Sequence, residues 1–124
     1  IRDLLRPSGE ERTLIRQEEQ QLYEYDEYKL QIRRLDFGKK RGIYEFSTYD
    51  PETKDTPPSW GLHPYAEVGV ILEGKMEVNL DGTVYLLGPG DSIYIKPNLY
   101  HTMRNAGDTP CRSFWHLQIM DDSV

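Results

Sequence analysis

The chain contains only one cysteine, Cys111, among its 124 residues. A single cysteine cannot form an internal disulfide, so the sequence excludes a disulfide-stapled secreted domain and favours a reducing compartment. No apolar run approaches the roughly 20 residues that a membrane-spanning helix requires. The opening residues, 1–6, carry charges where a secretory signal would be apolar. We therefore expect a cytoplasmic protein without a membrane partner.

The chain also lacks an excess of positive charge. It has 15 Lys and Arg against 21 Asp and Glu, for a formal net charge of −6. Nucleic-acid affinity comes mainly from cations that neutralise phosphates, so this composition argues against direct binding to DNA. The sequence begins at Ile1 rather than methionine, which favours a segment of a longer polypeptide. Any contact with DNA is then expected through a separate domain outside this chain.

No stretch shows a convincing 3.6-residue apolar period, so helix is expected to be a minor component. Short alternating segments bounded by turn residues predict strands instead, and Asp81-Gly82 is a strong hairpin signal. With room for one domain only, the pattern predicts an all-β sandwich or barrel over residues 28–124. The expected strands are one around Leu30 and Ile32, then Gly42–Tyr49, Val68–Leu72, Lys75–Leu80, Thr83–Leu87, Ser92–Ile95, His101–Asn105 and Arg112–Met120.

Residues 1–27 are rich in charged side chains and are expected to form a polar N-terminal arm or linker. Within this arm, residues 12–16 could form a short edge strand. Prolines and charged residues predict a loop over residues 50–59.

Two histidines and a glutamate suggest a metal site. His63 and Glu67 are four residues apart, so an unbroken strand would point both side chains to one face. His101 lies on a later strand, which a closed barrel would bring beside them. Two imidazoles and one carboxylate form a ligand set that leaves other coordination positions open. The spacing alone is also compatible with ordinary surface residues.

These residues belong to two longer motifs, H-x3-E-x6-G and G-D-x9-H-x3-N, which resemble the two motifs of the cupin superfamily. The resemblance implies a cupin-type jelly-roll β-barrel with metal ligands at His63, Glu67 and His101. The other matched positions are Gly74, Gly90 and Asn105.

The match has departures. Gly61 stands where the family has its first histidine, which leaves three ligands instead of four. Pro97 is displaced from the family position, and Asn98 replaces the second glycine. The expected cofactor is accordingly one divalent metal ion, Fe, Mn, Ni or Zn, with the absence of any metal kept as the alternative.

Four further residues are candidates for the lining of a ligand pocket: Tyr65, Tyr100, Arg104 and His116. Tyr65 would share a face with His63 and Glu67 on a regular strand. Arg104 has a planar fork of donors that suits a carboxylate or phosphate, unless alternation along its strand turns it outward. A core or rim position is the competing interpretation for His116.

Two functions remain open. The polar arm and residues 85–94 resemble the C-terminal cupin of helix-turn-helix transcriptional regulators, which implies a sensory domain that binds a small molecule. The alternative is a mononuclear metal enzyme similar to cupin epoxidases and dioxygenases, with His63, Glu67 and His101 as the triad. A homodimer is expected in either case, because jelly-roll barrels cover exposed edges by pairing.

Overall fold

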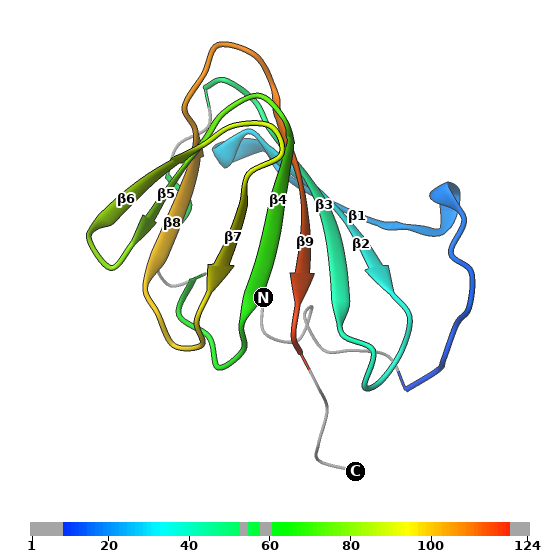
Figure 1. Ribbon diagram of the computed structural model, residues 1–124. Coiled ribbons are helices and arrows are strands. Elements are labelled where there is room, and N and C mark those ends of the chain that lie inside the picture. Colours follow the sequence, from blue (N-terminus) through cyan, green and yellow to red (C-terminus); the bar gives the residue numbers. More distant parts are fainter. Residues whose placement is uncertain (1–8, 53–54, 58–60, 120–124) are drawn as a thin grey trace.

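The computed structural model describes residues 9–52, 55–57 and 61–119. Within these residues, nine strands form two antiparallel sheets (Figure 1). The larger sheet has the order β1-β2-β3-β9-β4-β7 and the smaller has the order β6-β5-β8. The strands are β1 (Gln21–Tyr25), β2 (Leu30–Asp36), β3 (Ile43–Tyr49), β4 (Glu67–Glu73), β5 (Met76–Leu80), β6 (Thr83–Leu87), β7 (Ser92–Ile95), β8 (His101–Asn105) and β9 (Cys111–Leu117).

The all-β prediction is confirmed, and the strand order is that of a jelly roll. Among the described residues, the two sheets share no strand-to-strand ladder, so they face each other without closing into one continuous hydrogen-bonded barrel. Short 3-10 turns cover Gln17–Glu19 and Asp26–Tyr28. No helix within the described part of the chain has the length and apolar character needed to cross a membrane.

The predicted hairpin joins β5 to β6. Asp81 and Gly82 both adopt positive φ angles, 48° and 94°, as a tight two-residue turn requires. The backbone N–H of Gly82 donates to the side-chain oxygen of Asn79, which fixes the turn.

Strand alternation builds the core between the sheets. In β3 and β9 every second residue is buried, and the intervening residues lie on the outer face of the large sheet. Ile43, Ile71, Met76, Val78 and Ile95 are the largest apolar side chains with almost no exposed surface. This packing of both inner faces leaves a cavity between the two sheets.

The N-terminal segment differs from the expectation in two ways. Residues 12–16 form no strand, and Arg12 makes a single backbone hydrogen bond of 2.9 Å to the carbonyl oxygen of Phe37. Residues 21–25, expected as part of the polar arm, instead form β1, which pairs with β2 at the edge of the large sheet. At the other end, β9 stops at Leu117, and Met120 lies outside the described residues.

Candidate metal centre

The triad comes from three separate elements. Glu67 is the first residue of β4 and points inward, in line with the buried Gly69 and Ile71. His101 is the first residue of β8 in the facing sheet. His63 does not lie on a strand, which corrects the sequence expectation: it belongs to the loop that leads into β4. The loop, and not strand periodicity, therefore aims His63 at Glu67.

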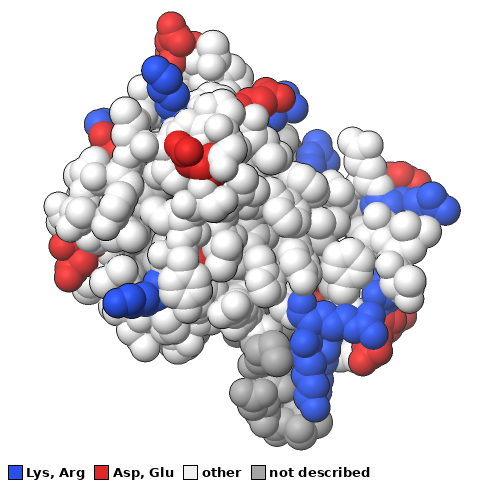
Figure 2. Space-filling view, in the orientation of Figure 1, with Lys and Arg blue, Asp and Glu red and all other residues white. Residues whose placement is uncertain are grey.

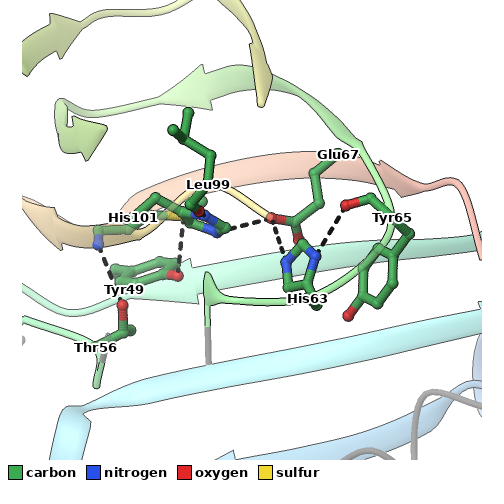
Figure 3. A network of polar contacts seen from close by, with 8 residues as sticks. Tyr49, Thr56, His63, Tyr65, Glu67, Leu99 and His101 are labelled. Carbon is green, nitrogen blue, oxygen red and sulfur yellow. Dashed lines mark hydrogen bonds and ion pairs between the residues drawn. The ribbon is translucent and has the colours of Figure 1, made fainter. Parts of the chain in front are cut away.

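The three side chains meet at one point (Figure 3). Oε2 of Glu67 lies 2.9 Å from Nε2 of His101 and 3.4 Å from Nε2 of His63. One ligand atom from each residue lies within 4.8 Å of the other two. Two ligand atoms each about 2.1 Å from a shared ion would stand roughly 3.0–3.4 Å apart at ordinary coordination angles. Both distances from Oε2 of Glu67 to an imidazole nitrogen therefore match those of two ligands that share an ion.

Backbone carbonyls orient both imidazoles. Nδ1 of His63 lies 2.9 Å from the carbonyl oxygen of Tyr65, and Nδ1 of His101 lies 3.0 Å from that of Leu99. A carbonyl only accepts hydrogen bonds, so Nδ1 must carry the proton in each ring. In the neutral ring, the lone pair then sits on Nε2 and points at Glu67. This is the arrangement that fixes metal-ligating histidines in other proteins.

Glu67 carries an unsatisfied oxygen. Its Oε2 is buried, and no donor in the described part of the chain meets hydrogen-bond geometry to it, although both Nε2 atoms are near. Burial by itself would raise the pKa of Glu67, but attraction to His101 and His63 outweighs burial and holds this pKa at about 2. Burial likewise opposes charge on His101, yet the carboxylate of Glu67 and the Leu99 carbonyl raise the pKa of His101 overall. The site thus favours a positive charge between these atoms.

The surroundings of Gly61 explain why no fourth ligand stands at this position. A Cβ atom at position 61 would stand 2.4 Å from the carbonyl oxygen of His101 and 2.8 Å from its Nδ1. Such distances are shorter than any ordinary contact, so no side chain, including histidine, fits while His101 keeps its place. The backbone at Gly61 instead packs directly against His101 and helps to position it.

A cavity of about 100 Å³ adjoins the triad. It has room for several water molecules or one small organic molecule. Tyr65 forms part of the wall, and its ring stacks on that of His63 at a centroid distance of 3.8 Å. Burial is the main reason that the pKa of Tyr65 is raised, so this phenol stays protonated. The lining residues are Tyr25, Leu30, Ile32, Arg34, Glu45, Ser47, Tyr49, Thr56, Gly61, Tyr65, Glu67, His101, Met103, Trp115 and Leu117.

Three of the predicted pocket residues are not in that wall. Arg104 lies between inward-facing residues of β8, so its side chain points outward, where it pairs with Glu77 at 2.7 Å. His116 occupies the outer face of β9 and stacks on Tyr44. Tyr100 is 50% exposed just before β8. The period of two along a strand accounts for Arg104 and His116.

The cavity wall also contains three polar residues that were not among the predicted pocket residues: Arg34, Glu45 and Thr56. Arg34 follows Leu30 and Ile32 at the same spacing of two residues along β2. The alternation that places these apolar residues inward therefore also predicts an inward arginine. Thr56 offered no such signal, because it comes from a loop. It is held in place by hydrogen bonds to the backbone of Met103.

The remaining motif residues have structural tasks. Asn105 is buried and donates to the carbonyl oxygens of Tyr49 and Thr109, each at 2.8 Å, which ties β3 to the turn after β8. Asn98 adopts a φ angle of 58°, a left-handed conformation that asparagine tolerates better than most residues. This explains how asparagine can replace the glycine of the second motif.

Comparison with known proteins places the chain in a family. Polyketide synthase CurC of Streptomyces cyaneus is 39% identical over 56 residues, which are 44% of this chain and 36% of that protein. Mannose-1-phosphate guanylyltransferase of Escherichia coli K12 is 33% identical over 79 residues, 60% of this chain and 16% of that enzyme. The chain therefore spans well under half the length of these curated relatives.

Among solved structures, an RmlC-like cupin from Shewanella frigidimarina superposes with a TM-score of 0.69. The two share 18% identity, and the match covers 94% of this chain and 99% of that one. At this identity the likeness shows the fold alone. Residues 45–117, more than half of the chain, match the family described as the cupin domain, and they include most of β3 and all of β4 to β9. The chain belongs to the cupin family.

Proposed function

We propose that this chain is a mononuclear metal-dependent cupin enzyme that binds a small molecule in its cavity and acts on it at the triad. The observation that carries the proposal is the buried, unsatisfied Oε2 of Glu67, which two imidazole Nε2 atoms face at 2.9 and 3.4 Å. Electron-rich atoms that converge in a buried site repel one another unless a proton or a metal ion lies between them, and one proton can bridge only two of the three. A divalent cation satisfies all three atoms.

The donor set fits such an ion. His63, Glu67 and His101 would hold it, and two imidazoles with one carboxylate suit Fe, Mn, Ni or Zn. When bound, the ion would supply Lewis acidity or redox chemistry to a molecule at its open positions. One carboxylate charge against a divalent ion leaves the site with a net charge of about +1, which favours an anionic ligand.

The chain's own residues prepare the site for this task. The carbonyls of Tyr65 and Leu99 keep the proton on Nδ1 of each imidazole, so Nε2 is available without a change of tautomer. The ring of Tyr65 covers one face of His63 and limits the access of water. Trp115 and Met103 add apolar surface to the wall, which favours an organic substrate.

The names of the two relatives described above, a polyketide synthase and a guanylyltransferase, favour a biosynthetic role. The proposal is limited to the cupin domain itself, because it corresponds to only part of each relative.

Metal titration monitored by thermal unfolding tests the proposal. Protein stripped with a chelator and then titrated with Mn²⁺, Fe²⁺, Ni²⁺ or Zn²⁺ should unfold at a higher temperature, because an ion that binds only the folded state stabilises it. His63→Ala should abolish the shift. His116→Ala is the matched control, since this histidine lies on the outer face and should leave the shift intact. Equal responses of both variants, or no response of the wild type, would contradict the proposal.

The sensory-domain hypothesis uses the same cavity and stays a prediction. Neither curated relative named above carries the name of a regulator. A sensory role would require the ligand to favour one arrangement of a larger assembly. Footprinting of operator DNA by the full-length protein, with and without ligand, would test this hypothesis, and an unchanged footprint would count against it.

A further inference from the structure

A buried ion pair forms the side of the cavity contributed by β2 and β3. Arg34 and Glu45 stand directly opposite each other in the ladder and are only 4% and 8% exposed. Both side chains line the same cavity as Glu67 and His101. One strand, β9, separates β3 from β4, so the strand that carries Glu45 runs two strand spacings, about 10 Å, from the strand that carries Glu67.

Stability alone gives little reason for this pair. Removing two charges from water costs several kcal/mol per ion, and apolar residues of similar volume are often equally or more stabilising. The neighbouring inward positions of β2, Leu30 and Ile32, show that this part of the wall can be apolar. Burial raises the pKa of Glu45 even though Arg34 opposes the shift, so the carboxylate depends on its partner for its charge.

The pairing geometry leaves Arg34 able to exchange its partner. Nε and Nη2 of Arg34 both donate to the same oxygen, Oε2 of Glu45, at 2.8 and 2.7 Å. A fork with one donor to each carboxylate oxygen is the stronger arrangement, and the pair does not have it. Cζ of Arg34 stands 4.6 Å from the ring centroid of Tyr23, which holds the guanidinium in position. A second carboxylate that enters the cavity would find a preorganised cation.

We propose that Arg34 binds the carboxylate of a small organic acid in this cavity, with Glu45 as the internal counter-ion that the ligand's carboxylate partly displaces. That such an acid is also the substrate rests on the proposed function, because the rest of the acid would then lie against the wall formed by Glu67 and His101. The apolar lining, including Trp115 and Met103, suits the hydrocarbon part of such an acid. Anion binding itself does not require the metal.

NMR titration of the isotope-labelled chain with matched acid and amide probes tests the inference. Each titration is done twice, once with a chelator present and once with saturating Zn²⁺ and no Mn²⁺. The pairs are propanoate with propanamide and benzoate with benzamide, which differ in charge but little in shape. The wild type should bind at least one acid about tenfold more tightly than its amide, because a charge-assisted bond replaces a neutral one. Glu45→Gln should tighten acid binding further, since it removes the competing carboxylate.

Loss of the cation should abolish the preference. With chelator present, so that no metal ion attracts the acid, Arg34→Met should bind acid and amide equally. Because that variant leaves Glu45 buried without its partner, the double variant Arg34→Met/Glu45→Leu provides a folded control and should also show no preference. Equal binding of acid and amide by the wild type, failure of every probe to bind, or a preference that survives Arg34→Met in the presence of chelator would overturn the inference. A preference seen with chelator while Zn²⁺ does not bind would uphold it and count against the proposed metal centre alone.

Discussion

At the scale of single residues, Glu67 decides the character of the site. Its carboxylate is the acceptor that both imidazoles face, and it receives no hydrogen bond of good geometry within the described residues. The histidines contribute direction through their Nδ1 protons, and Glu67 contributes charge. The metal-free site is therefore held together by electrostatic attraction that depends on the protonation of these three side chains.

The depressed pKa of Glu67 makes the stability of the metal-free protein depend on pH. A folded-state pKa of about 2, below the ordinary 4.5, means that the carboxylate stabilises the fold above pH 4.5. This contribution, at most about 3 kcal/mol, should be lost as the pH falls from about 4.5 to 2. Urea unfolding of chelator-treated protein at several pH values should show the loss in the wild type and a shallower profile in Glu67→Gln. Parallel profiles for the two proteins would contradict this account.

At the scale of elements, the loop before β4 and the start of β8 form one unit. Thr56 hydrogen-bonds the backbone of Met103, and Gly61 packs on His101, so the loop lies along β8 and fixes the first histidine of that strand. The position of His101 depends on a residue with no side chain.

Gly61→Ala tests this dependence. The added methyl group must displace the His101 backbone or move the loop, so the thermal shift caused by Zn²⁺ should fall markedly, and the fold should lose about 1–3 kcal/mol. Gly88→Ala is a suitable control, because the nearest atom to its new Cβ is 3.9 Å away. A Zn²⁺ response in Gly61→Ala equal to that of the control would show that this contact does not position His101.

Much of this architecture could be predicted from the sequence, because strands in a two-layer fold alternate between core and solvent. The alternation of Leu30 and Ile32 predicted β2. The same rule predicts an inward Arg34, which lies two residues beyond Ile32 on β2. The two cupin-like motifs, rather than strand alternation, predicted that His63, Glu67 and His101 meet.

Other features could not be predicted from local pattern. β1 is an edge strand whose residues are mostly exposed or half-buried, so it lacks the apolar alternation that identifies central strands. His63 reaches Glu67 from a loop, whose path depends on contacts far along the chain. Gly61 and His101 are 40 residues apart in the sequence, so no local sequence pattern indicates their close approach.

At the scale of the whole molecule, the two sheets enclose a cavity with Glu67, His101 and the Arg34–Glu45 pair in its wall. In the view of Figure 2, charged side chains lie mainly toward the edges of the face, and its middle is mostly uncharged. Apolar side chains are exposed on the outer face of the large sheet, among them Leu72 and Tyr94 at 48% and 55%. The expected homodimer stays a prediction, and a monomer found by light scattering at micromolar protein concentration would oppose it.

The most direct test of the central claim is a crystal structure of the metal-loaded protein with anomalous data collected at the absorption edge of the added metal. The account predicts a single strong peak about 2.0–2.2 Å from Nε2 of His63, Nε2 of His101 and Oε2 of Glu67, with further positions open toward the cavity. Crystals of the metal-loaded protein with no peak at the triad, or with the metal bound only elsewhere, would contradict it.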